Sequence, residues 1–394
     1  MSWEEKKLSD CCISIADGDH QAPPKADSGI PFVTISNINA NNQFDFTNTM
    51  FVPQAYYDSL DNKRKAQNGD VLYSVVGSFG IPVYIKETVP FVFQRHIAIL
   101  RPNDTILPQF LYYTMLSRDF YMMADAAALG AAQRTISLTA LRNMKISVPP
   151  MDVQEKIVGV LSAYDNLIEN NQKQIKLLEE AAQRLYKEWF VDLRFPGHET
   201  TPIVDGVPEG WSVESMDDIA EYINGYAFKP SDWGTSGKPI IKIKEMGLGV
   251  TSDTPRNSGE NIPEKYNITA GDILFSWSAT LSAMIWDEED GLLNQHLFKV
   301  IPGEGISREF VLQSILKTLD EFSNLTTGST MKHIQRGKLK EVKVNVPPTE
   351  LMEQYRNISE PIREQILNVK RQIILLREAR DRLLPKLMNE EIEV

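Results

Sequence analysis

Apolar residues recur at spacings of three and four along two long stretches of the chain, a pattern typical of amphipathic helices. The first stretch covers residues 152–190, and Asp152 with Glu155 three positions later can cap its start. The second lies within residues 349–394, where Pro361 predicts a kink or a restart. Each predicted helix carries one apolar seam.

A long helix with a single apolar seam needs a partner, and the two predicted helices have similar lengths. We therefore predict that they pack on each other as an antiparallel coiled coil. Asn171 falls in the seam, where it either fixes the register of the pair or lies on a solvated edge. The predicted seam consists of Ile157, Tyr164, Leu167, Asn171, Ile175, Leu178 and Leu185 in the first helix, and of Ile362, Val369, Ile373, Leu376 and Leu383 in the second.

The chain also contains an internal repeat, which the two helices belong to. The offset between matching residues drifts, which indicates loop insertions within a shared scaffold. Matching positions are Gly130 and Gly328, 198 apart, Pro149 and Pro347, also 198 apart, Gly69 and Gly271, 202 apart, and His96 and His296, 200 apart.

Each copy of the repeat is predicted to be an α/β part followed by a long helix. Alternating apolar residues before each Pro-Pro pair predict a half-buried strand at the junction. The expected fold class is α+β, with two similar globular α/β domains joined by two long helices in a pseudo-twofold repeat. The predicted division is 1–150 for the first α/β domain, 151–193 for the central helix, 194–210 for a linker, 211–348 for the second α/β domain, and 349–394 for the C-terminal helix and an acidic tail.

The composition is that of a folded soluble protein. The 394 residues are 42% hydrophobic and 24% charged, and no apolar run approaches the ~20 residues that cross a bilayer. Residues 1–15 mix acidic, basic and apolar side chains, unlike a signal peptide, so we expect a cytoplasmic protein. Cys11 and Cys12 are adjacent and form no disulfide framework, and we expect them to be reduced and structural.

Motifs for catalysis or metal binding are missing or weak. The sequence contains no HExxH and no GxSxG, and the glycines of residues 234–239 are too close together for a phosphate loop. Residues 17–20 (DGDH) could offer metal ligands, although Gly-Asp pairs are far more often turns. We therefore expect neither catalysis nor a bound metal in this chain.

The distribution of charge leaves room for nucleic-acid binding. A net charge of −12 opposes it, because neutralising phosphates normally dominates affinity. However, residues 126–151 and 331–340 contain no acid and fall at the same point of the repeat. The candidate DNA contacts are the basic triplet Lys63, Arg64 and Lys65, the polar triplets Gln94, Arg95, His96 and Asn294, Gln295, His296, the pair Tyr226 and Lys229, and, from the acid-free stretches, Gln133, Arg134, Lys332, His333, Arg336 and Lys338.

The polar triplets have the side chains that read bases. Gln, Asn and Arg carry paired donors and acceptors that match adenine or guanine edges in the major groove. Each triplet could equally hydrogen-bond a neighbouring loop, and the basic triplet could be a solvated loop. Two similar but non-identical heads on a spacer suit a target with two unlike half-sites separated by bases that the protein ignores.

The order of motifs resembles the specificity (S) subunit of type I restriction-modification enzymes over nearly the whole chain. Gly-Asp-Val/Ile-Leu, Gln/Asn-x-His, a glycine, a short strand and Val-Pro-Pro occur twice in this order, with Asn224-Gly225-Tyr226 and Val207-Pro208 as further matches. The resemblance implies a non-catalytic subunit with two target recognition domains, each binding one half of a bipartite, asymmetric site in double-stranded DNA. Ala131 and Ala132 depart from the pattern that Ser329 and Thr330 keep, which weakens any contact assigned to them.

The resemblance also implies partners. The paired helices would set the spacing of the half-sites and dock two modification methyltransferase subunits, and restriction subunits would complete the endonuclease. S-adenosylmethionine, ATP and magnesium would belong to these partners.

Two other functions fit parts of the sequence. The acidic balance favours a cytoplasmic scaffold that binds proteins through its two α/β heads, whereas the paired acid-free stretches oppose it. An enzyme with an unrecognised site, such as a nuclease, is supported only by weak acid-lysine pairs such as Glu264 and Lys265.

Overall fold

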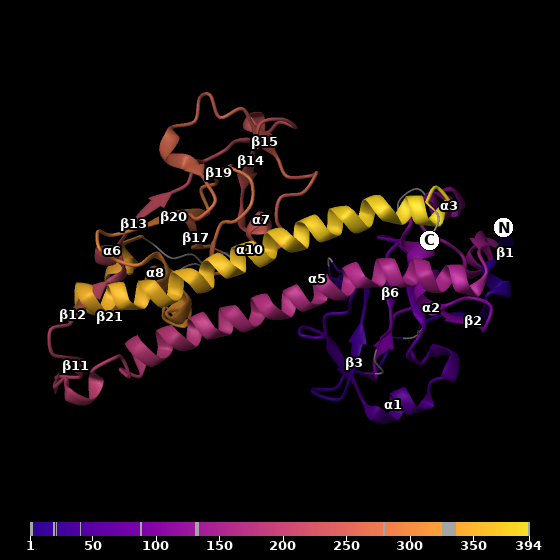
Figure 1. Cartoon of the computed structure of the whole chain (residues 1–394), viewed down its shortest axis with the longest axis horizontal. Helices are drawn as coiled ribbons and strands as arrows, with labels where there is room; N and C mark the ends of the chain where they lie inside the picture. Colours follow the sequence, from indigo (N-terminus) through magenta and orange to yellow (C-terminus); the bar gives the residue numbers. More distant parts are fainter. Residues whose placement is uncertain are drawn as a thin grey trace. The chain divides into compact units, whose positions relative to one another are not determined.

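A computed structural model of the chain describes residues 3–18, 20, 22–39, 41–86, 89–130, 134–278, 280–324 and 336–392. The chain divides into two compact units. Unit 1 comprises Met1–Asn170 and Ile373–Val394, and unit 2 comprises Asn171–Gln372. Each unit therefore holds one α/β domain together with a length of both long helices (Figure 1).

The α/β domain of unit 1 contains two small sheets and a strand pair. The larger sheet has the order β2-β8-β5-β6 with all neighbours antiparallel, and the smaller has the order β4-β3-β7 with β3 parallel to β7. The strands are β1 (Glu4–Lys7), β2 (Cys12–Asp17), β3 (Ile30–Val33), β4 (Met50–Val52), β5 (Val71–Ser74), β6 (Pro82–Tyr84), β7 (Val92–Phe93), β8 (Ile97–Pro102) and β9 (Lys145–Val148), which pairs with β1. The helices are α1 (Gln54–Ser59), α2 (Pro108–Leu116), α3 (Arg118–Ala127) and α4 (Leu138–Asn143), and a 3-10 turn, η3, covers Asn62–Arg64.

The core of unit 1 lies between the larger sheet and the helices. Tyr73 of β5 and Leu100 of β8 share a buried cluster with Phe110 of α2 and Ile157 of the first long helix. Strand β9 alternates exposed and buried residues, which confirms the half-buried strand predicted before the Pro-Pro pair. The domain is therefore fixed directly on a long helix.

The α/β domain of unit 2 repeats this plan. Its first sheet has the order β13-β20-β17-β18, all antiparallel, and its second has the order β15-β14-β19-β16, in which β14 is parallel to β19. The strands are β12 (Ser212–Ser215), β13 (Ala220–Asn224), β14 (Lys238–Ile241), β15 (Arg256–Asn257), β16 (Asn267–Ile268), β17 (Ile273–Ser276), β18 (Ser282–Ile285), β19 (Gly291–Leu293), β20 (Leu297–Pro302) and β21 (Lys343–Val346), which pairs with β12. The helices are α6 (Met216–Ile219), α7 (Ile243–Leu248), α8 (Arg308–Lys317) and α9 (Leu319–Asn324), with 3-10 turns η7 (Glu264–Tyr266) and η8 (Arg336–Lys340).

The segment predicted as a linker contains a small hairpin. Strands β10 (Ile203–Val204) and β11 (Val207–Pro208) pair across Asp205 and Gly206, whose φ values are 51° and 81°. An Asp-Gly pair with both φ angles positive is the preferred two-residue connection between antiparallel strands.

The two long helices confirm the main sequence prediction. Helix α5 covers Met151–Tyr186 and continues as a π-helical turn over Lys187–Val191, and α10 covers Thr349–Met388. Helix α10 runs through Pro361 without a break, so the restart is wrong, and a kink at this residue stays a prediction. The Pro361 ring is exposed. Because proline has no amide hydrogen, the carbonyl group four residues earlier loses its helical hydrogen bond, and it can face water instead.

The helices are antiparallel, because in each unit the start of one lies beside the end of the other. In unit 1, Ile157 and Leu161 of α5 share a buried cluster with Leu384 and Leu387 of α10. In unit 2, Tyr186 at the end of α5 and Trp189 in the π-helical turn that follows share a cluster with Leu351 and Tyr355 at the start of α10.

The amide of Asn171 donates from Nδ2 to Oε1 of Gln372 on α10 at 3.3 Å, in an exposed position within unit 2. The amide group therefore makes a cross-helix contact, and its role in fixing the register stays a prediction.

The predicted seam is wrong at Leu167, whose side chain is 51% exposed, whereas Ile168 is buried. A seven-residue spacing, the period of a coiled coil, links Ile157, Tyr164, Asn171, Leu178 and Leu185 of the predicted seam. The first half of α5 also packs on the α/β domain, since Ile157 and Leu161 share a buried cluster with Phe110 of α2. The other predicted positions, Tyr164, Leu178, Leu185, Ile362, Val369, Ile373, Leu376 and Leu383, are buried or half-buried.

Cys11 and Cys12 are both buried thiols. Burial raises the pKa of Cys12 to about 12, so this thiol stays protonated and unreactive at neutral pH. Among the residues that the structure describes, no helix is long and apolar enough to span a membrane.

Candidate nucleic-acid interface

The two polar triplets form equivalent turns, each leading from the sheet with a parallel strand pair into the all-antiparallel sheet of its unit. In unit 1 residues 94–96 connect β7 to β8, and the amide of Gln94 donates to the Val33 carbonyl at 3.2 Å. In unit 2 residues 294–296 connect β19 to β20, and the amide of Asn294 donates to the Ile241 carbonyl at 3.1 Å. Both triplets therefore occupy one defined position of the duplicated scaffold.

A glycine lies against each turn. The amide of Gly18 donates to the Ile97 carbonyl at 3.1 Å, and that of Gly225 donates to the Leu297 carbonyl at 3.0 Å. A Cβ atom on Gly18 would lie 2.3 Å from the Phe93 carbonyl oxygen, and one on Gly225 would lie 2.1 Å from the Asn294 carbonyl oxygen. No other residue type allows this backbone approach, which explains why both copies carry glycine here.

In unit 1 the turn borders a cavity of about 320 Å³. Arg95 and His96 line it together with Asp17, Thr135 and Ser137. Burial, together with the neighbouring Arg95 guanidinium, lowers the pKa of His96 from its ordinary value, so its ring is uncharged at neutral pH. A neutral imidazole can donate one hydrogen bond and accept another, which suits contact with a base edge.

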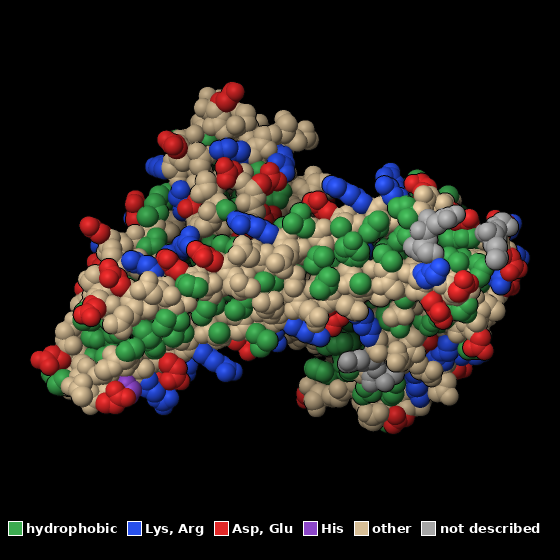
Figure 2. Space-filling model, in the orientation of Figure 1, with side chains coloured by type: hydrophobic (Ala, Val, Ile, Leu, Met, Phe, Trp, Pro, Cys, Tyr) green, Lys and Arg blue, Asp and Glu red, His purple; other side chains and the backbone are tan. Residues whose placement is uncertain are grey.

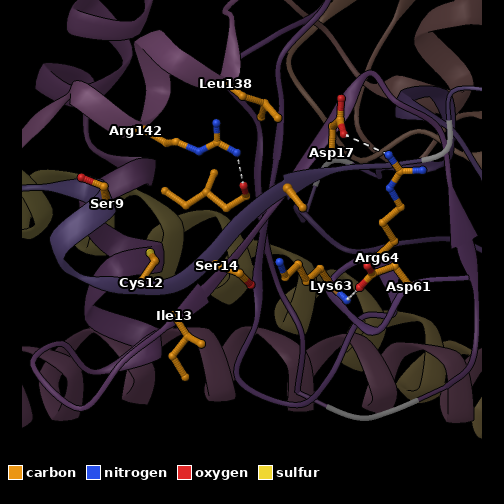
Figure 3. Close-up of a pocket in the computed structure, with 12 residues that line it drawn as sticks. Ser9, Cys12, Ile13, Ser14, Asp17, Asp61, Lys63, Arg64, Leu138 and Arg142 are labelled. Atoms are coloured by element: carbon orange, nitrogen blue, oxygen red, sulfur yellow. Dashed lines mark hydrogen bonds and ion pairs between the residues drawn. The ribbon is translucent and has the colours of Figure 1, made fainter.

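A larger hollow of about 690 Å³ adjoins the first, because Asp17 and Leu138 line both. Its floor is strand β2, and Lys63 of η3, Arg64 of η3 and Arg142 of α4 surround it (Figure 3). Three cations and two carboxylates, Asp17 and Asp61, therefore line this hollow.

The carboxylates of the hollow are already engaged. Asp17 lies 2.6 Å from Nε2 of His20 and 3.8 Å from a guanidinium nitrogen of Arg64. Asp61 accepts a hydrogen bond from the Lys63 amide at 2.8 Å, which caps η3.

Arg142 donates to the main-chain carbonyl of Ile15 at 2.6 Å. Within the described residues, neither Lys63 nor Arg142 forms an ion pair, so their charges are available to a ligand.

The side chains of the basic triplet do not all lie in the same place. Lys63 and Arg64 line the hollow, but Nζ of Lys65 donates to the Asp58 carbonyl at 3.0 Å and lies 5.2 Å from the centre of the Tyr57 ring. Lys65 therefore contacts α1 and is not among the residues that line the hollow.

Arg134 is also engaged within its own domain. Its guanidinium pairs with Asp125 and lies 5.6 Å from the centre of the Phe79 ring. Phe79 in turn stacks on Tyr121, with ring centres 5.7 Å apart. Gln133, Lys332 and His333 lie outside the described residues.

In unit 2, Tyr226 lies beside the polar turn, since its carbonyl accepts from the Gln295 amide at 2.9 Å. Its ring packs against Phe228 and Tyr266. His296 Nδ1 lies 3.2 Å from Oγ of Ser278, and the Asn294 side chain is buried in the turn.

The remaining candidates of unit 2 lie apart from this turn in the sequence. Lys229 is exposed at the start of a 3-10 turn, Arg336 is exposed in η8, and Lys338 pairs with Glu341 at 2.7 Å.

Residue-by-residue reasoning missed Arg142 as a candidate, although it lies in an acid-free stretch. The signal that identifies it is the repeat, because Lys340 occupies the matching position 198 residues later. Of the possible metal ligands in residues 17–20, Asp17 pairs with His20 and Arg64, and Asp19 lies outside the described residues. Within the described residues, no three His, Cys, Asp or Glu side chains gather in a way that could hold a metal ion.

Comparison with known proteins identifies relatives of the whole chain. The family described as "Type I restriction modification DNA specificity domain" matches residues 1–180 and 208–368. The MjaIX specificity subunit of a type I restriction enzyme from Methanocaldococcus jannaschii is 24% identical over 324 residues, covering 74% of this chain and 71% of that protein. The HindI specificity subunit from Haemophilus influenzae is 23% identical over 470 residues, covering 99% of both.

A solved structure shares the fold. The crystal structure of a type I restriction-modification S subunit from M. genitalium aligns with a TM-score of 0.54 and 14% sequence identity, covering 98% of this chain and 96% of that one.

Proposed function

The chain belongs to the type I restriction modification DNA specificity family, and on this premise we propose that it selects the DNA sequence on which a type I restriction-modification complex acts. Each α/β domain is then a target recognition domain that binds one half of a bipartite, asymmetric site. The chain supplies recognition, and its partner subunits supply the chemistry. S-adenosylmethionine, ATP and magnesium are bound by those partners, in the cytoplasm.

The proposal rests on one observation, which is that the two domains share a scaffold but carry different polar residues at equivalent positions. Both domains hold a glycine against a turn, but the turn is Gln94, Arg95 and His96 in one and Asn294, Gln295 and His296 in the other. The residue before the glycine also differs, since Asp17 is replaced by Asn224. Because different donor and acceptor patterns select different bases, two equivalent turns of unlike composition read two unlike half-sites.

The long helices provide surfaces for two copies of one partner. Apolar side chains are exposed along both helices (Figure 2). Val160 and Ile358 occupy matching positions of the repeat, as do Leu177 and Leu375, and all four side chains are more than a third exposed. Exposed apolar residues that recur in a duplicated sequence suit two identical docking partners, here two modification methyltransferase subunits, with restriction subunits completing the endonuclease.

The direct test is methylation in a host cell. The chain is co-expressed with the methyltransferase subunit of its own system, and chromosomal methyladenine is mapped by single-molecule sequencing. We expect a split motif with two different half-sites and a gap of fixed length. Two results would contradict the proposal and favour a protein-binding scaffold. Methylation could follow no split motif, or a complex that has assembled could methylate no DNA.

The same readout tests the role of the helices. Four residues inserted into each long helix add about one turn, or ~6 Å of length, so the gap should lengthen while both half-sites stay the same. An unchanged gap would show that the helices do not set it.

A further inference from the structure

We infer that the hollow over β2 binds the sugar-phosphate backbone of DNA, with Lys63 and Arg142 as phosphate contacts that add affinity without reading sequence. The inference rests on the proposed function and deepens it, because it separates the residues that hold DNA from the residues that select it.

Lys63 and Arg142 belong to two different elements, and both side chains approach strand β2. Lys63 extends from η3 toward Ser14, and Arg142 reaches β2 from α4 (Figure 3). The bond from Arg142 to the Ile15 carbonyl uses one of the five donors of a guanidinium and fixes its position, which leaves the others for a ligand. A held guanidinium loses less conformational entropy on binding than a mobile one.

Charge favours an anionic ligand. Asp17 and Asp61 are occupied by His20, by Arg64 and by the η3 amide, whereas Lys63 and Arg142 have no carboxylate partner within the described part of the chain. A phosphate group is the anion that a DNA-binding domain meets at every nucleotide, and Lys and Arg are its usual contacts.

The repeat supplies an independent argument. Lys265 in η7 matches Lys63 in η3, 202 residues apart, and Lys340 in η8 matches Arg142, 198 residues apart. Phosphates are the same at every base pair, so residues that contact them have no reason to differ between two recognition domains. Positive charge is kept at these two positions, while the residue before the glycine and the first two residues of the polar turn change.

In the second domain, one of the two matching cations has a carboxylate neighbour. Lys340 lies 3.9 Å from Asp217, with its side chain 71% exposed. An exposed ion pair of this length contributes little, so the lysine can exchange Asp217 for a phosphate at small cost.

The test measures the salt dependence of DNA binding by the assembled complex with methyltransferase subunits. Lys63→Ala and Arg142→Ala are compared with the native chain on a duplex carrying the methylated motif and on a scrambled duplex. We expect each variant to reduce the slope of log K against log[salt] by about one and to weaken binding to both duplexes by a similar factor. The methylated motif should not change.

Two further variants serve as controls. Arg118→Ala removes an exposed charge on α3 that does not line the hollow, and its slope should equal that of the native complex. Arg142→Lys keeps the charge, and it should restore most of the slope. Circular dichroism and the Tm establish that each variant is folded.

Three results would overturn the inference. The slope could stay unchanged in assembled variants, or binding could fall only on the specific duplex with an altered motif, which would make these residues base readers. The variants could also fail to recruit the methyltransferase, which would make the hollow a protein contact. A native complex with no split motif would instead defeat the proposed function itself.

Discussion

The positions of Gly18 and Gly225 show how single residues shape the recognition turns. Each has a carbonyl oxygen in the space that a Cβ atom would fill. The turn that follows β7 or β19 can therefore lie directly on the end of β2 or β13. Any side chain at these positions would push the turn, and the polar residues that it carries, away from the sheet.

Gly18→Ala and Gly225→Ala should each lower the free energy of unfolding by about 1–3 kcal/mol, the usual cost of forcing extra atoms into packed backbone. Urea unfolding of the purified chain measures the loss. Gly159→Ala is the matched control, because nothing lies within 4 Å of its Cβ position on α5, and alanine favours a helix over glycine by up to ~1 kcal/mol. Equal stability in all three variants would show that the turns tolerate displacement.

Sequence alone indicated the polar triplets and the glycines but not their contact. Gly18 and Gln94 are far apart in the chain, and only the pairing of β2 with β8 brings them together. The same limit explains why Lys63 and Lys65 were grouped, since a 3-10 turn directs neighbouring side chains to different surroundings. The repeat was the one sequence signal that reached beyond local patterns.

At the scale of elements, each long helix is tied to an α/β domain by a charged group. In unit 2, Arg363 of α10 forms a bidentate contact with Glu309 of α8, at 2.9 and 3.0 Å, and both side chains are buried. In unit 1, Asp165 of α5 accepts from Tyr113 of α2 at 2.6 Å and pairs with Arg380 of α10 at 2.7 Å. Asp165 and Arg363 are 198 residues apart, so these ties occupy matching positions.

Arg363→Ala should destabilise the chain by about 3–5 kcal/mol, because it leaves the Glu309 carboxylate buried without its partner. Arg382→Ala on the same helix removes an exposed partner of Glu378 and should change stability by no more than about 0.5 kcal/mol. Urea unfolding of both variants provides the comparison. If the two losses were similar, the buried pair would not be what fixes α10 to the domain.

The two long helices were the most predictable elements, and the errors in predicting them have physical causes. Spacings of three and four located both helices, since burial of one stripe is enough to define the period. The error at Leu167 falls in the first half of α5, which packs against both α10 and the α/β domain, so that the residues buried there do not all face α10. Local sequence does not reveal a second packing partner.

At the scale of the whole molecule, the duplication explains how an acidic chain can recognise DNA. The charge of −12 is spread unevenly, with acids gathered in the tail and around residues 287–290, and the basic positions of η3 and α4 recur in η7 and η8. One scaffold repeated in a single chain allows each recognition domain to vary without affecting the other. This independence is the central claim of the account.

Replacing residues 1–150 with the corresponding domain of another family member tests this independence most directly. The swapped chain is co-expressed with the methyltransferase subunit, and methyladenine is mapped across the host chromosome. One half-site should change, while the other half-site and the gap stay the same. A change in both half-sites would contradict the account.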